Sequence, residues 1–135
     1  MKPACRAKSS RSDDPARQKC GTGKWIRHRE KIEHATSYNE ARRRAIKESR
    51  LEGVPTKPFI SYMGPDKGKV LGSQSLDGYN YWRIDYDPKS SKQFHVNWRR
   101  IYRDKKGNCV QETGAYLLPG GQDSYWYQRE RMPKL

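Results

Sequence analysis

The sequence predicts an α+β domain, in which N-terminal helices pack on a twisted antiparallel sheet of about four or five strands. Helix signals are confined to the stretch before Pro55, where a capping box precedes an arginine-rich run. After Pro55, β-branched and aromatic residues alternate with polar ones, and turns containing Gly or Pro recur. Strands joined by short turns form antiparallel sheets, and helices that precede such a sheet cover one of its faces.

Composition limits the class of protein. The chain has 135 residues, of which 33% are hydrophobic and 33% are charged, so we expect one domain with a small, aromatic-rich core. Residues 1–23 are polar and rich in Ser, Gly and Pro; we expect a flexible linker or tail there, and the domain at residues 24–135. No apolar run reaches the roughly 20 residues of a membrane span. The formal net charge of +14 favours a polyanionic partner such as nucleic acid.

A short helix is expected at Lys24–His34. Trp25 and Ile32 lie seven residues apart, on one face of a helix, and charged residues fill most other positions. His28 and His34 lie on this segment, where a histidine among charged neighbours usually contacts only water. We leave their roles open.

A second helix is expected from Ser37 to Gly53, with Pro55 just beyond its end. In the capping box, the Ser37 hydroxyl accepts from the Glu40 amide and the Glu40 carboxylate accepts from the Ser37 amide. One side of the helix is apolar, with Tyr38, Ala41 and Ala45. Much of the rest is basic, with Arg42, Arg43, Arg44, Lys47 and Arg50. These residues either face water or bind a phosphate backbone, and we name Arg43 and Lys47 as candidate substrate contacts.

Strands are expected at Lys69–Ser73, Tyr79–Asp85, Gln93–Tyr102, Cys109–Glu112 and Ser124–Arg129. The turns between them are at Asp77-Gly78, Asp87-Pro88-Lys89-Ser90, Lys106-Gly107-Asn108 and Pro119-Gly120-Gly121. Aromatic residues gather at Tyr125-Trp126-Tyr127, Tyr116 and Trp98. They form either the core or an exposed surface on which unpaired bases stack.

The strand at Gln93–Tyr102 carries the candidate site. Side chains alternate between the two faces of a strand, so the face opposite Phe94, Val96 and Trp98 carries His95, Asn97 and Arg99. Cleavage of RNA by internal transesterification needs a base for the 2′-hydroxyl, an acid for the leaving oxygen and positive charge for the phosphorane. Histidine fills either proton role, and arginine matches phosphate oxygens. The alternative is a polar strand face that meets only water.

The strand at Tyr79–Asp85 is expected to pair antiparallel with it. This pairing adds Tyr81, Arg83 and Asp85 to the face of His95, provided that the register is not shifted by one residue. The alternative for Arg83 and Asp85 is an ordinary cross-strand ion pair.

We expect the residues on the face of His95 to have distinct roles in cleavage. His95 is expected to act as general acid or base, oriented by Asp85, while Arg83 and Arg99 bind the phosphate and stabilise its charge. Asn97 either orients the phosphate or reads a base edge. Further substrate contacts are expected, on grounds of charge and face, at Tyr81, Arg100 and Lys69.

No metal site or cofactor is expected. The chain has no phosphate-binding loop, dinucleotide fingerprint or zinc-protease spacing. We place Asp85 and Asp87 on opposite faces of their strand, which disfavours a shared metal ion. The three cysteines, Cys5, Cys20 and Cys109, have no metal-binding spacing and are expected as free thiols, with a Cys5–Cys20 bridge as the alternative.

Three short motifs suggest a family. Gly53-Val54-Pro55 follows a helix, and Arg83-Ile84-Asp85-Tyr86-Asp87-Pro88 and His95-Val96-Asn97 lie on neighbouring strands. This order resembles the C-terminal toxin domains of bacterial polymorphic toxins, the variable tips of Rhs-type and contact-dependent inhibition proteins. The resemblance covers about Asn39 to Arg100. It departs from the family where Lys92-Gln93-Phe94 replaces the usual Gly-Pro-His approach to the histidine.

The resemblance implies a nuclease, and we expect a metal-independent endoribonuclease of the barnase, EndoU, colicin and RelE-like group, with tRNA among its candidate substrates. It also implies delivery as the C-terminal part of a larger secreted effector, action in the cytoplasm of a target cell, and an acidic immunity protein as partner. By motif, only Arg83, Asp85, His95 and Asn97 carry over. Two alternatives stay open: a non-catalytic nucleic-acid-binding module, and a toxin domain that cleaves DNA.

Overall fold

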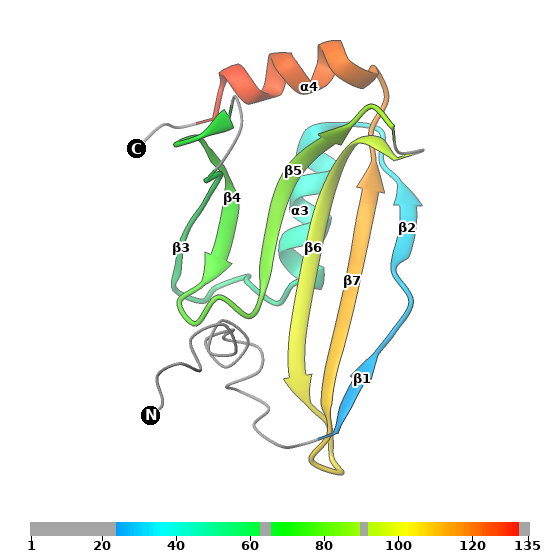
Figure 1. The fold of residues 1–135 in the computed structure, drawn as a ribbon, viewed down its shortest axis with the longest axis vertical. Helices are drawn as coiled ribbons and strands as arrows, with labels where there is room; N and C mark the ends of the chain where they lie inside the picture. Colours follow the sequence, from blue (N-terminus) through cyan, green and yellow to red (C-terminus); the bar gives the residue numbers. More distant parts are fainter. Residues whose placement is uncertain (1–23, 63–65, 90–91, 133–135) are drawn as a thin grey trace, which may run out of the picture.

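The computed structural model describes residues 24–62, 66–89 and 92–132. They form one seven-stranded sheet and two helices (Figure 1). In chain order the elements are β1 (Trp25–Arg27), β2 (Lys31–His34), α3 (Tyr38–Glu48), β3 (Thr56–Ile60), β4 (Val70–Ser75), β5 (Tyr81–Asp87), β6 (Gln93–Arg103), β7 (Cys109–Leu117) and α4 (Gly121–Glu130). The strand order is β1-β7-β6-β5-β4-β3, and β2 also pairs with β7.

The predicted fold class is wrong. We expected helices packed on an antiparallel sheet of about four or five strands. The described residues instead form a mixed sheet of seven strands with only two short helices. Antiparallel pairing runs from β7 through β6, β5 and β4 to β3, whereas β1 and β2 run parallel to β7.

The helix predicted at Lys24–His34 is absent, and two strands take its place. β1 and β2 pair with the outer edge of β7, with Trp25 opposite Cys109 and Ile32 opposite Ala115. Without them that edge of β7 would leave a row of backbone N–H and C=O groups unpaired. This pairing outweighs a weak helical pattern that rested on two large apolar residues.

The predicted helix at Ser37 is confirmed as α3. The Ser37 hydroxyl accepts from the Glu40 amide at 3.1 Å, as expected. The Glu40 carboxylate, however, accepts from the Thr36 amide at 2.8 Å rather than from that of Ser37. The helix ends at Glu48, earlier than predicted, and Arg50 takes a φ of 61° just after it. The apolar side is as expected, since Ala41 and Ala45 lie in the core cluster and the partly buried Tyr38 packs against it.

α4 lies where we expected a strand at Ser124–Arg129, so that prediction is wrong. Gly120 takes a φ of 91°, in the left-handed region that favours glycine, and begins the helix. The buried Tyr125 ring stacks on Tyr86 with 5.4 Å between centroids, and its hydroxyl donates to Asp66 Oδ2 at 2.6 Å. These contacts hold α4 across one end of the sheet (Figure 1).

The strands predicted at Lys69–Ser73, Tyr79–Asp85 and Gln93–Tyr102 are confirmed as β4, β5 and β6, with bounds that differ by at most two residues. β7 continues past the predicted end at Glu112 to Leu117. β3 was not predicted; it carries Pro58, which suits its place at the edge of the sheet.

The core lies between the sheet and the two helices. α3 lies behind the sheet in Figure 1 and packs against the apolar face of β5 and β6. The main buried side chains that the sheet contributes to this core are Trp82, Ile84, Phe94, Val96, Trp98 and Tyr116. The opposite face of these strands carries polar side chains instead.

Cys109 is fully buried and disulfide-bonded, so the expectation of a free thiol is wrong at this position. Cys5, Cys20 and the linker expected at residues 1–23 lie outside the described residues, as does Ser90 of one predicted turn. None of the helices formed by the described residues is long and apolar enough to cross a membrane.

Candidate functional site

The pairing of β5 with β6 brings the candidate residues together on the face away from α3. Asp85 lies opposite His95, Arg83 opposite Asn97, and Tyr81 opposite Arg99. Paired residues of an antiparallel sheet point to the same side. The expected antiparallel pairing and its register are therefore confirmed.

All of these side chains except that of Arg99 line a cavity of about 340 Å³, which we call the polar cavity. Its acidic, basic and amide side chains are Glu30, Arg83, Asp85, Asp87, Lys92, His95 and Asn97. Three of them are carboxylates and two are permanent cations, so the cavity itself is close to neutral although the chain carries +14. The cleft is therefore less positive than we expected from the sequence.

His95 forms the floor of the polar cavity and is only 2% exposed. Its Nδ1 lies 2.7 Å from the Gln93 carbonyl oxygen, so Nδ1 carries a proton and donates it. Its Nε2 then faces Asp85 Oδ2 at 3.7 Å. Burial lowers the pKa of His95, while the Gln93 carbonyl and the Asp85 carboxylate oppose that effect.

Asp85 lies between His95 and solvent. Its side chain is 40% exposed. Asn97 Nδ2 donates to its Oδ2 at 3.4 Å, and the Tyr86 amide donates to its Oδ1 at 2.8 Å. The carboxylate is thus held from two sides and remains open to the cavity.

Arg83 lies beside this pair. Its Nε is buried and has no hydrogen-bond partner among the described residues. Its guanidinium carbon lies 5.3 Å from the ring centroid of Phe59 and 5.6 Å from that of Tyr81. The two rings hold the guanidinium by cation–π contact without using its N–H groups. No carboxylate of the described residues lies within salt-bridge distance of Arg83, so the Arg83–Asp85 ion pair weighed as an alternative is absent.

Arg99 shares the face but does not line the polar cavity. Its Nε donates to the Tyr79 carbonyl at 3.0 Å, and one Nη donates to the Gly78 carbonyl at 3.1 Å. Its guanidinium also lies 4.9 Å from the Tyr81 ring centroid. Arg99 therefore holds the turn before β5 in place.

Of the expected substrate contacts, only Tyr81 lines the polar cavity. Arg100 points to the helix side, where it donates to Glu112 and Glu48 at 2.6 and 2.8 Å. Lys69 donates to the carbonyl of Arg129 in α4. The other two, Arg43 and Lys47, lie on α3, so the sheet separates them from His95.

Sequence reasoning missed three charged residues of the polar cavity, Glu30, Asp87 and Lys92, and also Thr113 and Gly114. Asp87 lies on the same face as Asp85, and the expectation that the two lie on opposite faces is wrong, because residues two apart on a strand share a face. The period of two along the strand was the available signal, and applied correctly it places Asp87 beside Asp85. Glu30 and Lys92 form an ion pair at 3.1 Å and come from segments outside β5.

The described residues contain no group of three or more His, Cys, Asp and Glu side chains arranged to hold a metal ion. His28 does not line the polar cavity; its Nδ1 lies 3.3 Å from Glu112 Oε2.

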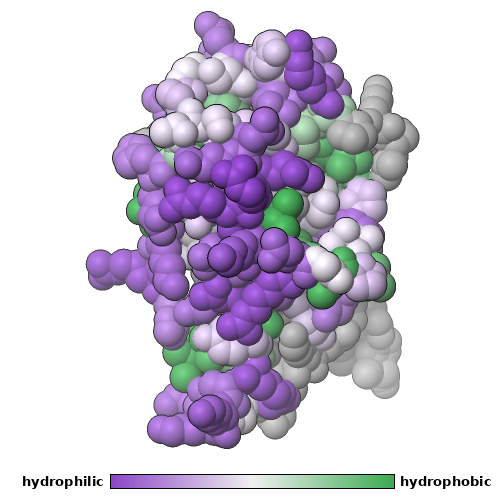
Figure 2. Space-filling view, turned by 180° about the vertical axis from the view of Figure 1, so that it is seen from behind, coloured by the Kyte–Doolittle hydropathy of each residue, from purple (hydrophilic) through white to green (hydrophobic). Residues whose placement is uncertain are grey.

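Figure 2, seen from behind the view of Figure 1, shows hydrophilic residues over much of the middle of the face on which α3 lies.

The aromatic residues that the sequence analysis grouped together fall into a buried set and an exposed set. Tyr125, Tyr116 and Trp98 are buried in the core, whereas Trp126 and Tyr127 are exposed on α4. The core interpretation therefore holds for the first three and not for the last two.

Comparison of the sequence with models of known protein families gives no match, and comparison with curated proteins gives none either.

Proposed function

We propose that this chain is an endoribonuclease domain whose polar cavity binds the scissile phosphate. One observation carries the proposal. A buried imidazole and an open carboxylate, His95 and Asp85, lie 3.7 Å apart, beside an arginine whose buried Nε has no hydrogen-bond partner among the described residues. Transesterification of a phosphodiester needs a proton acceptor and preorganised positive charge in one place.

In this mechanism Asp85 contacts the 2′-hydroxyl directly. His95 contacts Asp85 and does not contact the 2′-hydroxyl itself. The Asp85 side chain is 40% exposed and His95 is 2% exposed, so a substrate reaches Asp85 before His95. The bond from Nδ1 to Gln93 leaves the Nε2 lone pair of the neutral ring directed at Asp85. The proton of the 2′-hydroxyl passes to the Asp85–His95 pair as the 2′-oxygen bonds to phosphorus, and the leaving 5′-oxygen takes a proton from water as its bond to phosphorus breaks.

Arg83 supplies the positive charge. A guanidinium offers five N–H donors in a planar fork that matches phosphate oxygens. In Arg83 that fork is held by two aromatic rings, and no carboxylate of the described part of the chain pairs with it and competes with a phosphate. Asn97 keeps the Asp85 carboxylate in position.

The biological setting remains part of the proposal and rests on the motifs at Gly53-Val54-Pro55, Arg83–Pro88 and His95-Val96-Asn97. In that setting the domain is the toxic tip of a larger effector, it cuts RNA in a target cell, and an acidic immunity protein neutralises it. The charge of +14 supports both an anionic substrate and an acidic partner.

The second candidate is a nucleic-acid-binding module without chemistry. The low exposure of His95 favours it over an enzyme. Such a module loses affinity steeply as salt rises and yields no product at any concentration.

Two matched substitutions of His95 test the enzyme. In His95→Asn, the side-chain amide reaches the place of Nδ1 and keeps the bond to Gln93, but nothing replaces Nε2. In His95→Gln, the amide reaches toward Asp85 but cannot accept a proton. We expect both variants to cleave RNA at least about 100-fold more slowly than the wild type, the scale of general base catalysis.

Affinity for RNA is measured in parallel and is expected to change less than about threefold, because His95 lies beneath Asp85. Circular dichroism confirms that each variant folds. A folded His95→Asn variant with the cleavage rate of the wild type would rule out this mechanism.

A further inference from the structure

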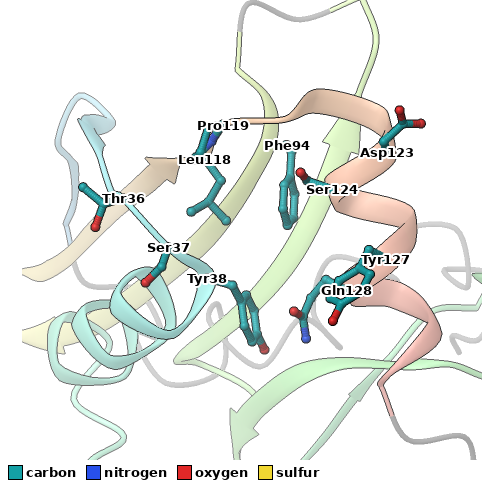
Figure 3. A pocket seen from close by; sticks show the side chains of 10 residues that line it. All are labelled: Thr36, Ser37, Tyr38, Phe94, Leu118, Pro119, Asp123, Ser124, Tyr127 and Gln128. Carbon is teal, nitrogen blue, oxygen red and sulfur yellow. The ribbon is translucent and has the colours of Figure 1, made fainter.

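A second cavity lies on the helix side of the sheet, between the start of α3 and α4 (Figure 3). It has a volume of about 460 Å³, and we call it the interhelical pocket. Phe94 and Leu118 extend into it from β6 and from the segment after β7, Tyr38 enters from α3, and Tyr127 and Gln128 enter from α4. None of these residues belongs to the polar cavity.

The walls of the interhelical pocket combine aromatic surface with hydrogen-bonding groups. Tyr38, Phe94 and Tyr127 supply the aromatic surface, and Tyr127 is 60% exposed. Hydroxyl, carboxylate and amide groups are present on Ser37, Asp123, Ser124 and Gln128. Apolar faces bordered by donors and acceptors suit a flat ligand whose edge is polar.

The interhelical pocket is connected to the polar cavity around the end of the sheet. A third cavity, of about 510 Å³, shares Thr36, Leu118 and Pro119 with the interhelical pocket and Lys92 with the polar cavity. Gln93 lines this connecting cavity. Its φ of 44° is unusual for a residue with a side chain, and its carbonyl accepts from His95. A strained residue thus lies at the junction of the two sites.

The opposite end of the interhelical pocket is basic. A fourth cavity, of about 310 Å³, shares Tyr38 and Gln128 with it and adds Arg42 and Arg131. The Arg131 guanidinium lies 3.5 Å from the ring centroid of Tyr127. Cations therefore lie at both ends of the interhelical pocket. Arg42 and Arg131 lie at one end, and Lys92 of the connecting cavity lies at the other.

We propose that the interhelical pocket binds one unpaired base of a single-stranded RNA whose scissile phosphate lies in the polar cavity. This inference rests on the proposed function for the identity of the strand. A groove that alternates cations with aromatic rings is typical of proteins that bind single strands, in which bases stack and phosphates meet the cations. Paired bases cannot enter, because their edges and faces are already occupied within a duplex. The substrate is therefore single-stranded at the nucleotide that the interhelical pocket binds.

The test uses binding rather than cleavage. The probe is a fluorescent single strand of about six nucleotides, within the site sizes of such grooves, with 2′-fluoro sugars so that it cannot be cut. Fluorescence anisotropy compares the wild type with Tyr127→Ala and with the control Tyr62→Ala. Tyr62 is 77% exposed and lines none of the four cavities.

We expect Tyr127→Ala to weaken binding about tenfold, as loss of one stacked base does, and Tyr62→Ala to leave it within about twofold. An abasic residue at one position of the probe should weaken wild-type binding equally and have no further effect on Tyr127→Ala. Equal affinity of wild type and Tyr127→Ala overturns the inference, and so does a wild type that does not bind the probe. If the wild type binds in this way but cuts no RNA, the base pocket stands and the proposed nuclease fails.

Discussion

Replacing Arg83 with methionine separates the chemistry of the polar cavity from its stability. In the free protein, Arg83 Nε is buried and has no hydrogen-bond partner within residues 24–62, 66–89 and 92–132, and the guanidinium contacts the rings of Phe59 and Tyr81. Removing the unsatisfied donor relieves a desolvation penalty of about 1–3 kcal/mol. Losing two cation–π contacts costs about 0.5–1 kcal/mol each, and the methionine sulfur restores part of the packing on the rings.

The two effects nearly cancel, so we expect the free energy of unfolding of Arg83→Met to change by less than about 1 kcal/mol, a shift of less than about 5 °C in Tm. Cleavage should fall about 100-fold or more, since loss of one preorganised transition-state donor typically has that effect. Thermal denaturation and single-turnover cleavage of a short RNA measure the two quantities.

Arg99→Met is the matched control on the neighbouring strand. Arg99 donates to the carbonyls of Gly78 and Tyr79, and the loss of these two bonds should lower stability by about 1–3 kcal/mol. Its cleavage rate, measured below its Tm, should stay within about threefold of the wild type. The reasoning fails if Arg83→Met unfolds, or if it cleaves RNA as fast as the wild type.

Four further predictions concern titration, packing and a buried ion pair. Because burial lowers the pKa of His95, cleavage should rise with pH through a midpoint below 6.5. Stability should decline as pH falls below about 6.5, since the unfolded chain then binds a proton that the native His95 does not; urea titrations of the wild type should show this and those of His95→Asn should not. Gly114→Ala should lower Tm strongly, because the added methyl would lie 2.3 Å from atoms of the Trp98 ring. Arg100→Met should cost about 3–5 kcal/mol in chemical denaturation by leaving the buried Glu112 carboxylate without its closest cation.

The sequence predicted the centre of the sheet well, for a local reason. In β5 and β6 the period of two is strong, so the faces of Trp82 and Val96 on one side and of Arg83 and Asn97 on the other follow directly. The start of α3 was also predictable, because the Ser37 cap is a contact between near neighbours.

The edges of the fold could not be predicted in this way. β1 and β2 are strands because β7 lies beside them, and that partner is about 80 residues away in the sequence. Gly114 interrupts the apolar pattern of β7 because the Trp98 ring occupies the space where a side chain would lie. Three consecutive aromatic residues at Tyr125–Tyr127 fit a strand or a helix equally well, and the Asp66 contact that anchors α4 is long-range.

In the candidate site, too, local patterns were predictable from the sequence and long-range contacts were not. Alternation along two strands placed Asp85, His95 and Asn97 together, but it did not reveal that His95 is almost fully buried. Glu30 and Lys92 enter the polar cavity from other segments and have no local signal. Arg100 was grouped with Arg99 by charge, although adjacent residues on a strand face opposite ways.

The most direct test is incubation of the purified protein with total RNA and with duplex DNA, with and without EDTA, followed by analysis of the new ends. The mechanism at Asp85 and His95 predicts RNA fragments that end in 2′,3′-cyclic phosphate, the same yield in EDTA, and intact DNA. Intact RNA under all conditions, or cleavage that EDTA abolishes, would contradict it.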